Sequence, residues 1–224
     1  MSNESNDQNV TPFPGKKAPD PGSGPVLNLP PAVKALSLVL ILCFIVQKLL
    51  PQGYFYPWAF VPARYTGGMP LGLEGLLSPA THMFLHGGIL HLVLNVGTLM
   101  AFGAGLEKEI GARKFLLLYF ASGIFGAFSQ AAVYPLMQSP LIGASGGISG
   151  LFGGVLMMMY TRGLMGRGYR KLLPFVVIWI GISYFFGAYG MPGAEGNIAW
   201  PPHVGGFIAG LLLYRPITRS RMQH

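Results

Sequence analysis

Seven polar side chains interrupt long apolar runs of this sequence, and their types can support chemistry. They are Ser145, Ser149, His82, His86, His91, His203 and Asn95. A polar group within an apolar run is costly to bury, so it commonly marks a functional site or a contact between helices. A serine beside a histidine base can act as a nucleophile, and several histidines together can hold a metal ion.

The nucleophile hypothesis rests first on Ser145, which lies in the motif Gly143-Ala144-Ser145-Gly146. Its glycines would let a substrate backbone approach closely, because they carry no side chain. The motif stands at the expected start of a helix, where backbone N–H groups lack partners and can stabilise a developing oxyanion. The motif therefore predicts that Ser145 attacks a carbonyl group.

Three further residues complete this hypothesis. His203 stands near the start of another apolar run and could accept the proton of the serine. His91 and Asn95 are four residues apart, hence on one helix face, and both can donate hydrogen bonds to the oxyanion. No Asp or Glu lies in the apolar runs to orient His203, so the sequence predicts a Ser-His dyad rather than a triad.

Structural roles compete with this hypothesis. Ser149 lies in a second motif of the same type, about 6 Å deeper, and is the weaker candidate because free amide donors occur at a helix start. Glycines that recur every four residues favour close packing between helices instead. They are Gly146, Gly150 and Gly154 in one run, and Gly206 and Gly210 in another.

A metal site is disfavoured by the spacing of the histidines. His82 and His86 would share one helix face, but His91 would lie about 180° away from His82. The zinc-protease pattern H-E-x-x-H is absent from the sequence. We therefore expect no metal ion and no other cofactor.

The apolar runs indicate helices that cross a membrane. Hydrophobic residues make up 51% of the chain and charged residues only 10%, against roughly 25% charged residues in soluble domains. A crossing helix needs about 20 apolar residues. The sequence predicts an all-α bundle of six such helices, at residues 32–50, 80–106, 114–136, 141–161, 172–190 and 200–214. The intervening segment 51–79, rich in Gly, Pro and aromatic residues, suits the membrane interface.

Charge sets the expected domain limits and orientation. A polar, disordered tail is predicted at 1–31, a membrane domain at 32–215 and a basic tail at 216–224. The net charge of +8 could suggest a nucleic-acid partner, but the basic residues lie in short turns between apolar runs, so none is expected. Thirteen of the 15 Lys and Arg residues fall on one side of the membrane if both termini are cytoplasmic. The polar residues of the second, fourth and sixth runs then share the outer half of the membrane.

The chain resembles the rhomboid family of intramembrane serine proteases over residues 51–215. The residues that carry this resemblance are His82-Met83-Phe84-Leu85-His86-Gly87-Gly88-Ile89-Leu90-His91-Leu92-Val93-Leu94-Asn95, Gly105-Leu106-Glu107, Gly143-Ala144-Ser145-Gly146, and His203-Val204-Gly205-Gly206 with Gly210. The resemblance implies a six-helix core, with the site in a water-filled cavity that opens to the outside. It also implies a serine endopeptidase of a bacterial inner membrane, acting on single-span membrane proteins within the lipid bilayer.

Residue roles follow from the same resemblance. It implies Ser145 as nucleophile, His203 as base, and an oxyanion hole of His91, Asn95 and the Ser145 amide. Supporting positions are His82, His86, Gly143, Gly146 and Gly206, and Glu107 resembles an anchor at the cytoplasmic end. Loop 191–199 matches the family's mobile cap, and Trp179, Tyr184 and Phe185 match its lateral gate.

The sequence departs from the family at two places, and two other classes of function compete. Leu77-Ser78 stands where some members carry a Trp-Arg pair, and Ser149 stands where many carry an aromatic residue that supports the base. A non-catalytic member that binds or escorts membrane proteins usually lacks the serine or the histidine. A small transporter or proton channel is disfavoured because the apolar runs hold no Asp or Glu and show no inverted repeat.

Overall fold

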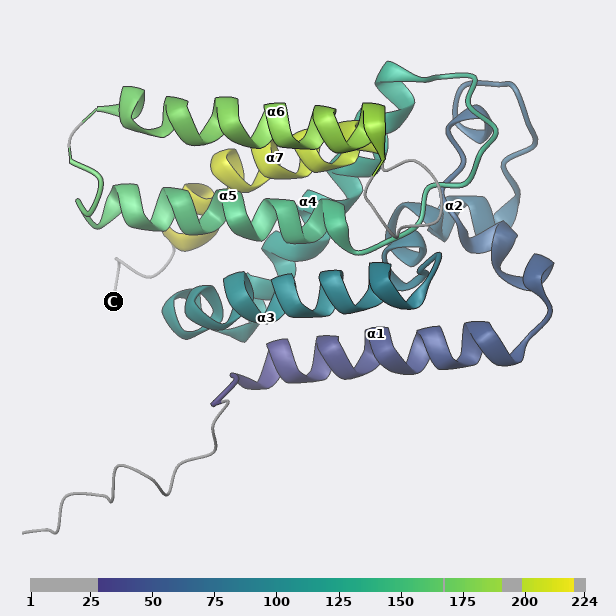
Figure 1. Cartoon of the computed structure of the whole chain (residues 1–224), viewed down its shortest axis with the longest axis horizontal. Coiled ribbons are helices and arrows are strands. Elements are labelled where there is room, and N and C mark those ends of the chain that lie inside the picture. The colour runs from purple at the N-terminus through teal and green to yellow at the C-terminus, as the bar shows by residue number, and fades with distance from the viewer. Residues whose placement is uncertain (1–27, 167, 191–198, 220–224) are drawn as a thin grey trace, which may run out of the picture.

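The computed structural model describes residues 28–166, 168–190 and 199–219, and it is helical throughout (Figure 1). The helices are α1 (Pro31–Leu49), α2 (Gly72–Thr81), α3 (Ile89–Ile110), α4 (Ala112–Val133), α5 (Ser145–Thr161), α6 (Leu173–Tyr189) and α7 (Trp200–Arg219). Short 3-10 turns lie between them: η1 (Gln52–Trp58), η2 (Pro62–Arg64), η3 (His82–Phe84) and η4 (Tyr169–Leu172). Within these residues the only strand-like pairing is a bridge between Phe60 and Leu141. The predicted all-α fold class is confirmed.

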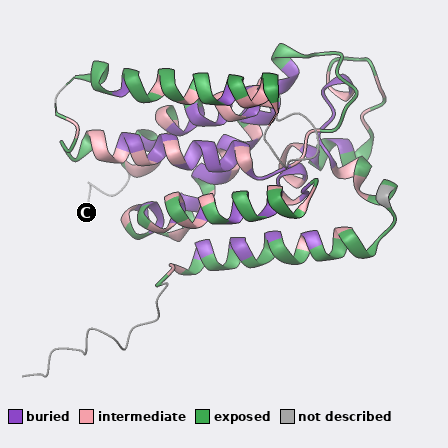
Figure 2. Ribbon diagram, viewed as in Figure 1, coloured by how far each residue is buried: buried purple, intermediate pink, exposed green. Residues whose placement is uncertain are grey.

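The long helices alternate in direction along the chain, so α3, α5 and α7 all begin at the same end of the bundle (Figure 1). Helices α1 and α6 lie at opposite edges, and α5 and α7 lie between them. Figure 2 shows the consequence for burial, since α5 is largely buried while α1 and α6 are exposed along most of their length. Only Ser183 is buried among the 17 residues of α6. This exposed apolar surface suits contact with lipid.

Four helical stretches of the described chain are long and apolar enough to cross a membrane: Pro31–Leu49, Ile89–Ile110, Ala112–Val133 and Tyr169–Tyr189. Helix α5 has only 17 residues, and the 20 residues of α7 include Arg215 and Arg219. Both helices are enclosed by the others, so they need less apolar surface of their own. The prediction of six crossing helices stays a prediction for these two.

Glycines bring α7 against α5 at backbone distance. A Cβ atom built on Gly206 would lie 2.0 Å from the carbonyl oxygen of Gly146, and one on Gly210 would lie 1.9 Å from that of Gly150. Such distances are far inside van der Waals contact, so only glycine fits. The predicted packing face is confirmed at these two levels.

The third glycine of this series, Gly154, is also closely packed, but against helices other than α7. Gly154 packs against Leu118 of α4 and Leu106 of α3, while Gly153 faces the carbonyl oxygen of Phe207 in α7. A helix turns about 100° per residue, so two steps of four residues rotate a position by about 80°. A step of four residues followed by one of three, as from Gly146 to Gly150 to Gly153, keeps the position within about 20° of its starting direction, as in a heptad repeat.

Two expectations about the helices need correction. The second apolar run was predicted at 80–106, but the helical turns end at Phe84, the chain is extended at Leu85, and α3 begins only at Ile89. The interfacial segment 51–79 contains helix α2, which was not expected. Residues 216–219 of the predicted basic tail 216–224 are helical, since α7 continues to Arg219. Most of the predicted N-terminal tail and of loop 191–199 lies outside the described residues.

The segment between α1 and α3 is held by partly buried hydrogen bonds rather than by a Trp-Arg pair. The hydroxyl of Tyr65 bonds to the Ser78 hydroxyl at 2.7 Å and donates to the Gly75 carbonyl oxygen. Burial raises the pKa of the Tyr65 phenol above its ordinary value, so the phenol keeps the proton that it donates. Arg64 donates to the carbonyl oxygen of Pro57 at 2.8 Å. These bonds fix α2 against the preceding turns.

Glu107 ties the start of α1 to the end of α3. Its buried carboxylate accepts hydrogen bonds from the backbone N–H groups of Ala32, at 2.9 Å, and Val33, at 2.7 Å. The first N–H groups of a helix have no partner within the helix, so the carboxylate serves as a cap supplied by another element. The anchor role implied for Glu107 thus has a structural basis.

We expect Glu107→Gln to lower the free energy of unfolding by about 1–3 kcal/mol, because the amide side chain cannot accept both buried N–H bonds. Thermal unfolding of the purified protein in detergent measures this effect. Glu109→Gln on the same helix is the matched control, since a partly exposed carboxylate paired with Arg162 contributes about 0–1 kcal/mol. Equal losses in the two variants would contradict the capping role.

Candidate active site

Ser145 is the first residue of α5, and the turn before it is fixed by long-range backbone bonds. The N–H of Gly143 donates to the carbonyl oxygen of His82 at 2.9 Å. Two residues earlier, Leu141 and Phe60 exchange hydrogen bonds of 2.7 and 3.1 Å. No side chain caps the start of α5. The first N–H groups of this helix, including that of Ser145, are therefore left without a side-chain partner.

The imidazole of His91 rests directly on this turn. Gly143 has a φ of +120°, a conformation that other residues rarely adopt. A Cβ atom built on Gly143 would lie 2.8 Å from both Cε1 and Nε2 of His91 and 3.9 Å from Oγ of Ser145. The bare α-carbon of this glycine thus lets the His91 ring and the Ser145 hydroxyl share one small space.

Asn95 lies one turn along α3 from His91 and is buried. Its Nδ2 atom donates to the carbonyl oxygen of His91 at 2.8 Å. This bond holds the amide on the side of α3 that carries His91. The two residues are on one helix face, as the spacing predicts.

His203 is the fourth residue of α7, and its helix starts against the start of α5. The position of a Cβ on Gly146, next to Ser145, is 3.5 Å from the carbonyl oxygen of Pro202, next to His203. Within the described chain no hydrogen bond joins His203 to the Ser145 hydroxyl. Such bonds are often long in unliganded enzymes and tighten when substrate binds.

His82 and His86 do not lie on one helix face, which corrects that expectation. His82 belongs to the 3-10 turn η3, and its Nδ1 atom is 3.0 Å from the carbonyl oxygen of Ser78. His86 follows in the extended connection to α3, where its ring contacts the ring of His91 with centroids 5.2 Å apart. His86 thus forms the wall behind His91.

Gln47 is a site residue that sequence reasoning missed. Its side-chain amide donates to the carbonyl oxygen of His86 at 2.8 Å and accepts from the His86 N–H at 3.0 Å. This pair of bonds joins α1 to the segment that supports His91. The signal was available, because Gln47 is the only amide side chain in the apolar run 32–50.

The three aromatic residues expected at a gate have different environments. Trp179 packs against Phe152 and Phe207, and its Nε1 atom donates to the carbonyl oxygen of His203 at 3.4 Å. Tyr184 and Phe185 are exposed on α6. Trp179 and Tyr184 therefore both contact the helix of His203, since the Tyr184 ring packs edge-on against Trp200 with centroids 5.8 Å apart, whereas Phe185 contacts Phe186 of its own helix.

Ser149 lies one turn into α5 and is almost completely buried. It follows Ser145 toward the interior, where Gly150 packs on Ser122 of α4. The Ser145 position at the helix start has the free amide that the Ser149 position lacks.

Known proteins match this part of the chain. A family model described as "Rhomboid domain" matches residues 74–220, which include every residue of the site described above except Gln47 and Phe60. The protein named "Putative rhomboid protease YdcA" of Bacillus subtilis (strain 168) is 33% identical over 182 residues, covering 81% of this chain and 84% of that protein. "Rhomboid protease GlpG" of Yersinia pestis (strain Pestoides F) is 32% identical, covering 62% of this chain and 48% of its own length.

A plant protein is similar over a shorter part. "RHOMBOID-like protein 4" of Arabidopsis thaliana is 35% identical over 130 residues, which are 58% of this chain and 31% of the plant protein. This chain thus spans about a third of that relative. Since the family model covers the site and the Bacillus protein aligns over most of both chains, this chain belongs to the rhomboid family.

Proposed function

We propose that this protein is an intramembrane serine endopeptidase that uses Ser145 as nucleophile and His203 as base. One observation carries the proposal: the bare Gly143 turn lets the His91 ring and the Ser145 hydroxyl meet at the uncapped start of α5. A hydroxyl, free N–H groups and a ring that can donate a hydrogen bond supply the nucleophile and the oxyanion donors of acyl transfer, and His203 at the adjoining helix start would supply the base.

The proposed reaction follows from these groups. Ser145 Oγ attacks the scissile carbonyl carbon while His203 removes its proton, and the carbonyl oxygen becomes an oxyanion. The Ser145 N–H, the His91 ring and the Asn95 amide donate hydrogen bonds to that oxyanion. His203 then protonates the leaving amine, and water hydrolyses the acyl-enzyme. His203 must be neutral to act as the base.

The proposed substrates are single-span membrane proteins whose helix unwinds near the site. A helical carbonyl is protected by its own hydrogen bond, so a segment with helix-breaking residues exposes its carbonyl groups most readily. Such a segment would approach from lipid on the side of α6, since only Ser183 is buried in this helix. Tyr184 and Phe185 would line that approach.

We infer that all six long helices cross the membrane, with both termini cytoplasmic. Helix α5 has 17 residues, so it is about 26 Å long against a hydrocarbon core of about 30 Å. If its last turn lies at the cytoplasmic boundary, Ser145 lies a few ångströms below the outer one. Water can reach that depth, which the hydrolysis step needs.

The decisive experiment uses a serine-directed fluorophosphonate on the purified protein in detergent. We expect covalent labelling, with the modified peptide identified by mass spectrometry as the one that carries the adduct on Ser145. The reagent should also stop cleavage of a single-span test substrate in liposomes. An adduct on Ser149, or cleavage that continues after complete labelling of Ser145, would refute the assignment. A folded protein that binds such a substrate without cleaving it would support an escort role instead.

Gly143→Ala is expected to lower the cleavage rate about 10- to 100-fold, because a small displacement of catalytic groups is enough to cost that much. The added methyl would lie 2.8 Å from the His91 ring, and the φ of +120° would strain it. Cleavage of the test substrate at matched protein amounts measures the loss. Gly87→Ala is the control, since its nearest neighbour would be Ile142 at 3.8 Å. Normal cleavage by Gly143→Ala would show that the His91 ring need not rest on this turn.

A further inference from the structure

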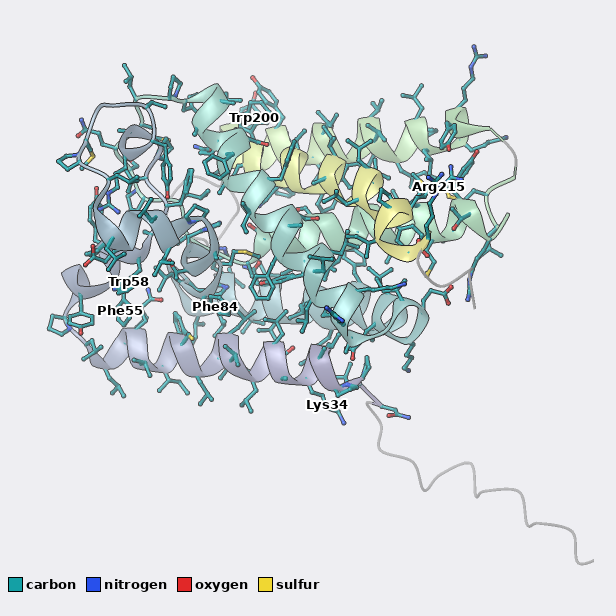
Figure 3. All side chains as sticks on the ribbon, turned by 180° about the vertical axis from the view of Figure 1, so that it is seen from behind. Lys34, Phe55, Trp58, Phe84, Trp200 and Arg215 are labelled. Carbon is teal, nitrogen blue, oxygen red and sulfur yellow. The ribbon has the colours of Figure 1, made fainter. Side chains whose placement is uncertain are left out.

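A pocket of about 680 Å³ opens at the end of the bundle opposite Ser145. It is lined by the ends of α3, α5 and α7, by the start of α4 and by η4. Figure 3 shows Arg215 near that end of α7 and Trp200 at the other. The volume falls in the range of about 300–1,000 Å³ that is typical of small-molecule sites. We propose that this pocket binds the phosphate group of an anionic membrane lipid.

Charge is the first argument. Among the described residues that line the pocket, Lys114, Arg215 and Arg219 are basic and Glu109 is the only carboxylate. The Glu109 carboxylate forms an ion pair with Arg162, so the lining keeps an excess of positive charge. A guanidinium group can grip a phosphate through two parallel hydrogen bonds. The pocket therefore selects an anion.

The phenols of the pocket are the second argument. Three tyrosines line it, and the rings of Tyr160 and Tyr169 are stacked with centroids 4.7 Å apart. The Tyr169 hydroxyl accepts a hydrogen bond of 2.6 Å from Nη1 of Arg215, which directs this guanidinium along the pocket wall. Side chains with an apolar body and a polar tip suit the boundary between headgroups and acyl chains.

The place of the pocket identifies the source of the phosphate. Helix α3 ends at Ile110 and α4 begins at Ala112, and both are long and apolar enough to cross a membrane. A turn between two crossing helices lies at the membrane boundary, where lipid headgroups are concentrated. Basic pockets between helices at this level bind anionic headgroups in other membrane proteins.

Two structural requirements, compensation of helix dipoles and orientation in the membrane, explain part of the positive charge at this end of the bundle but do not explain the pocket. Cations at the ends of α5 and α7 complement the helix dipoles, and basic turns fix orientation. Neither requirement calls for a cavity of this size, or for an arginine held by a tyrosine inside it. Arg113 meets the orientation requirement equally well without lining the pocket.

The test measures thermal stabilisation of the full-length protein in a non-ionic detergent. Three ligands are titrated: short-chain phosphatidylglycerol, short-chain phosphatidylcholine and inorganic phosphate. We expect phosphatidylglycerol to raise the unfolding temperature more than either of the others. Arg219→Gln and Arg215→Gln should each weaken half-saturation by about fivefold, the usual contribution of one basic residue near an anionic lipid. Lys114→Gln gives a third, independent position.

Arg113→Gln is the matched control, because it removes the same charge from the same end of the bundle. It should keep the response of the wild type. An equal loss in Arg113→Gln would overturn the proposal in favour of general surface charge. Full stabilisation by inorganic phosphate would assign the pocket to a soluble anion and overturn the lipid source. No stabilisation by any of the three ligands would overturn the site altogether.

Discussion

Ser145→Ala is expected to reduce cleavage of a single-span substrate at least about 10,000-fold, to the background of the assay, because the attacking oxygen is gone. The fold should be unchanged, since the hydroxyl makes no hydrogen bond within the described chain. The rate is measured in liposomes by the appearance of the cleaved fragment. Ser149→Ala is the matched control and should retain cleavage. Cleavage that is retained by Ser145→Ala and lost in Ser149→Ala would show that Ser149, one turn into α5, is the nucleophile.

The same assay tests whether His203 and Ser145 work as a unit. His203→Gln alone should lose about as much activity as Ser145→Ala, and the double variant should lose no more, because removing either member of a catalytic pair disables the other. Additive losses would indicate two separate roles.

Comparison of membrane proteomes from cells with the wild type and with Ser145→Ala would then reveal natural substrates.

Gly210→Val is expected to cost about 3 kcal/mol or more in stability, the upper range for overfilling a packed interior. Its Cβ would lie 1.9 Å from the carbonyl oxygen of Gly150, a backbone atom that cannot move without separating α5 from α7. The expected result is a large fall in the unfolding temperature in detergent, or a protein that aggregates on extraction. The position is two turns from His203, so the effect is on packing first.

The control for this prediction is Gly181→Val on α6, where a Cβ would meet nothing within 4 Å. It should unfold at the wild-type temperature or slightly above, because glycine is a poor helix former. Gly210→Ala should fall between the two. Equal stability of Gly210→Val and the wild type would mean that the two helices are not in backbone contact.

The regular helices could be predicted from the sequence because length and hydropathy define them. The run 172–190 became α6 at Leu173–Tyr189, and 32–50 became α1 at Pro31–Leu49. The start of α3 was missed by nine residues, because hydropathy is high on both sides of Gly87-Gly88 and does not report backbone conformation. Helix α2 was missed for the opposite reason, since Gly and Pro interrupt its apolar pattern.

The candidate site could be predicted in its residues but not in its geometry. Spacing and depth were enough to select Ser145, His91 and His203 from the sequence. The contact of His91 with Gly143 depends on a backbone bond between Gly143 and His82, which are 61 positions apart in the printed sequence. A bond over such a distance leaves no local pattern. The pair of hydrogen bonds between Gln47 and His86 was missed for the same reason, although the sequence shows an amide side chain within an apolar run.

The Glu107 cap has a consequence for the order in which the helices pack together during synthesis. The N–H groups of Ala32 and Val33 bind a carboxylate that lies 75 and 74 residues further along the chain. Translation of that stretch takes about 4–15 s. During that delay the first helix can enter the bilayer but cannot lock into place. Its docking is therefore a late step of biogenesis, completed only after α3, the helix that carries Glu107, has been inserted.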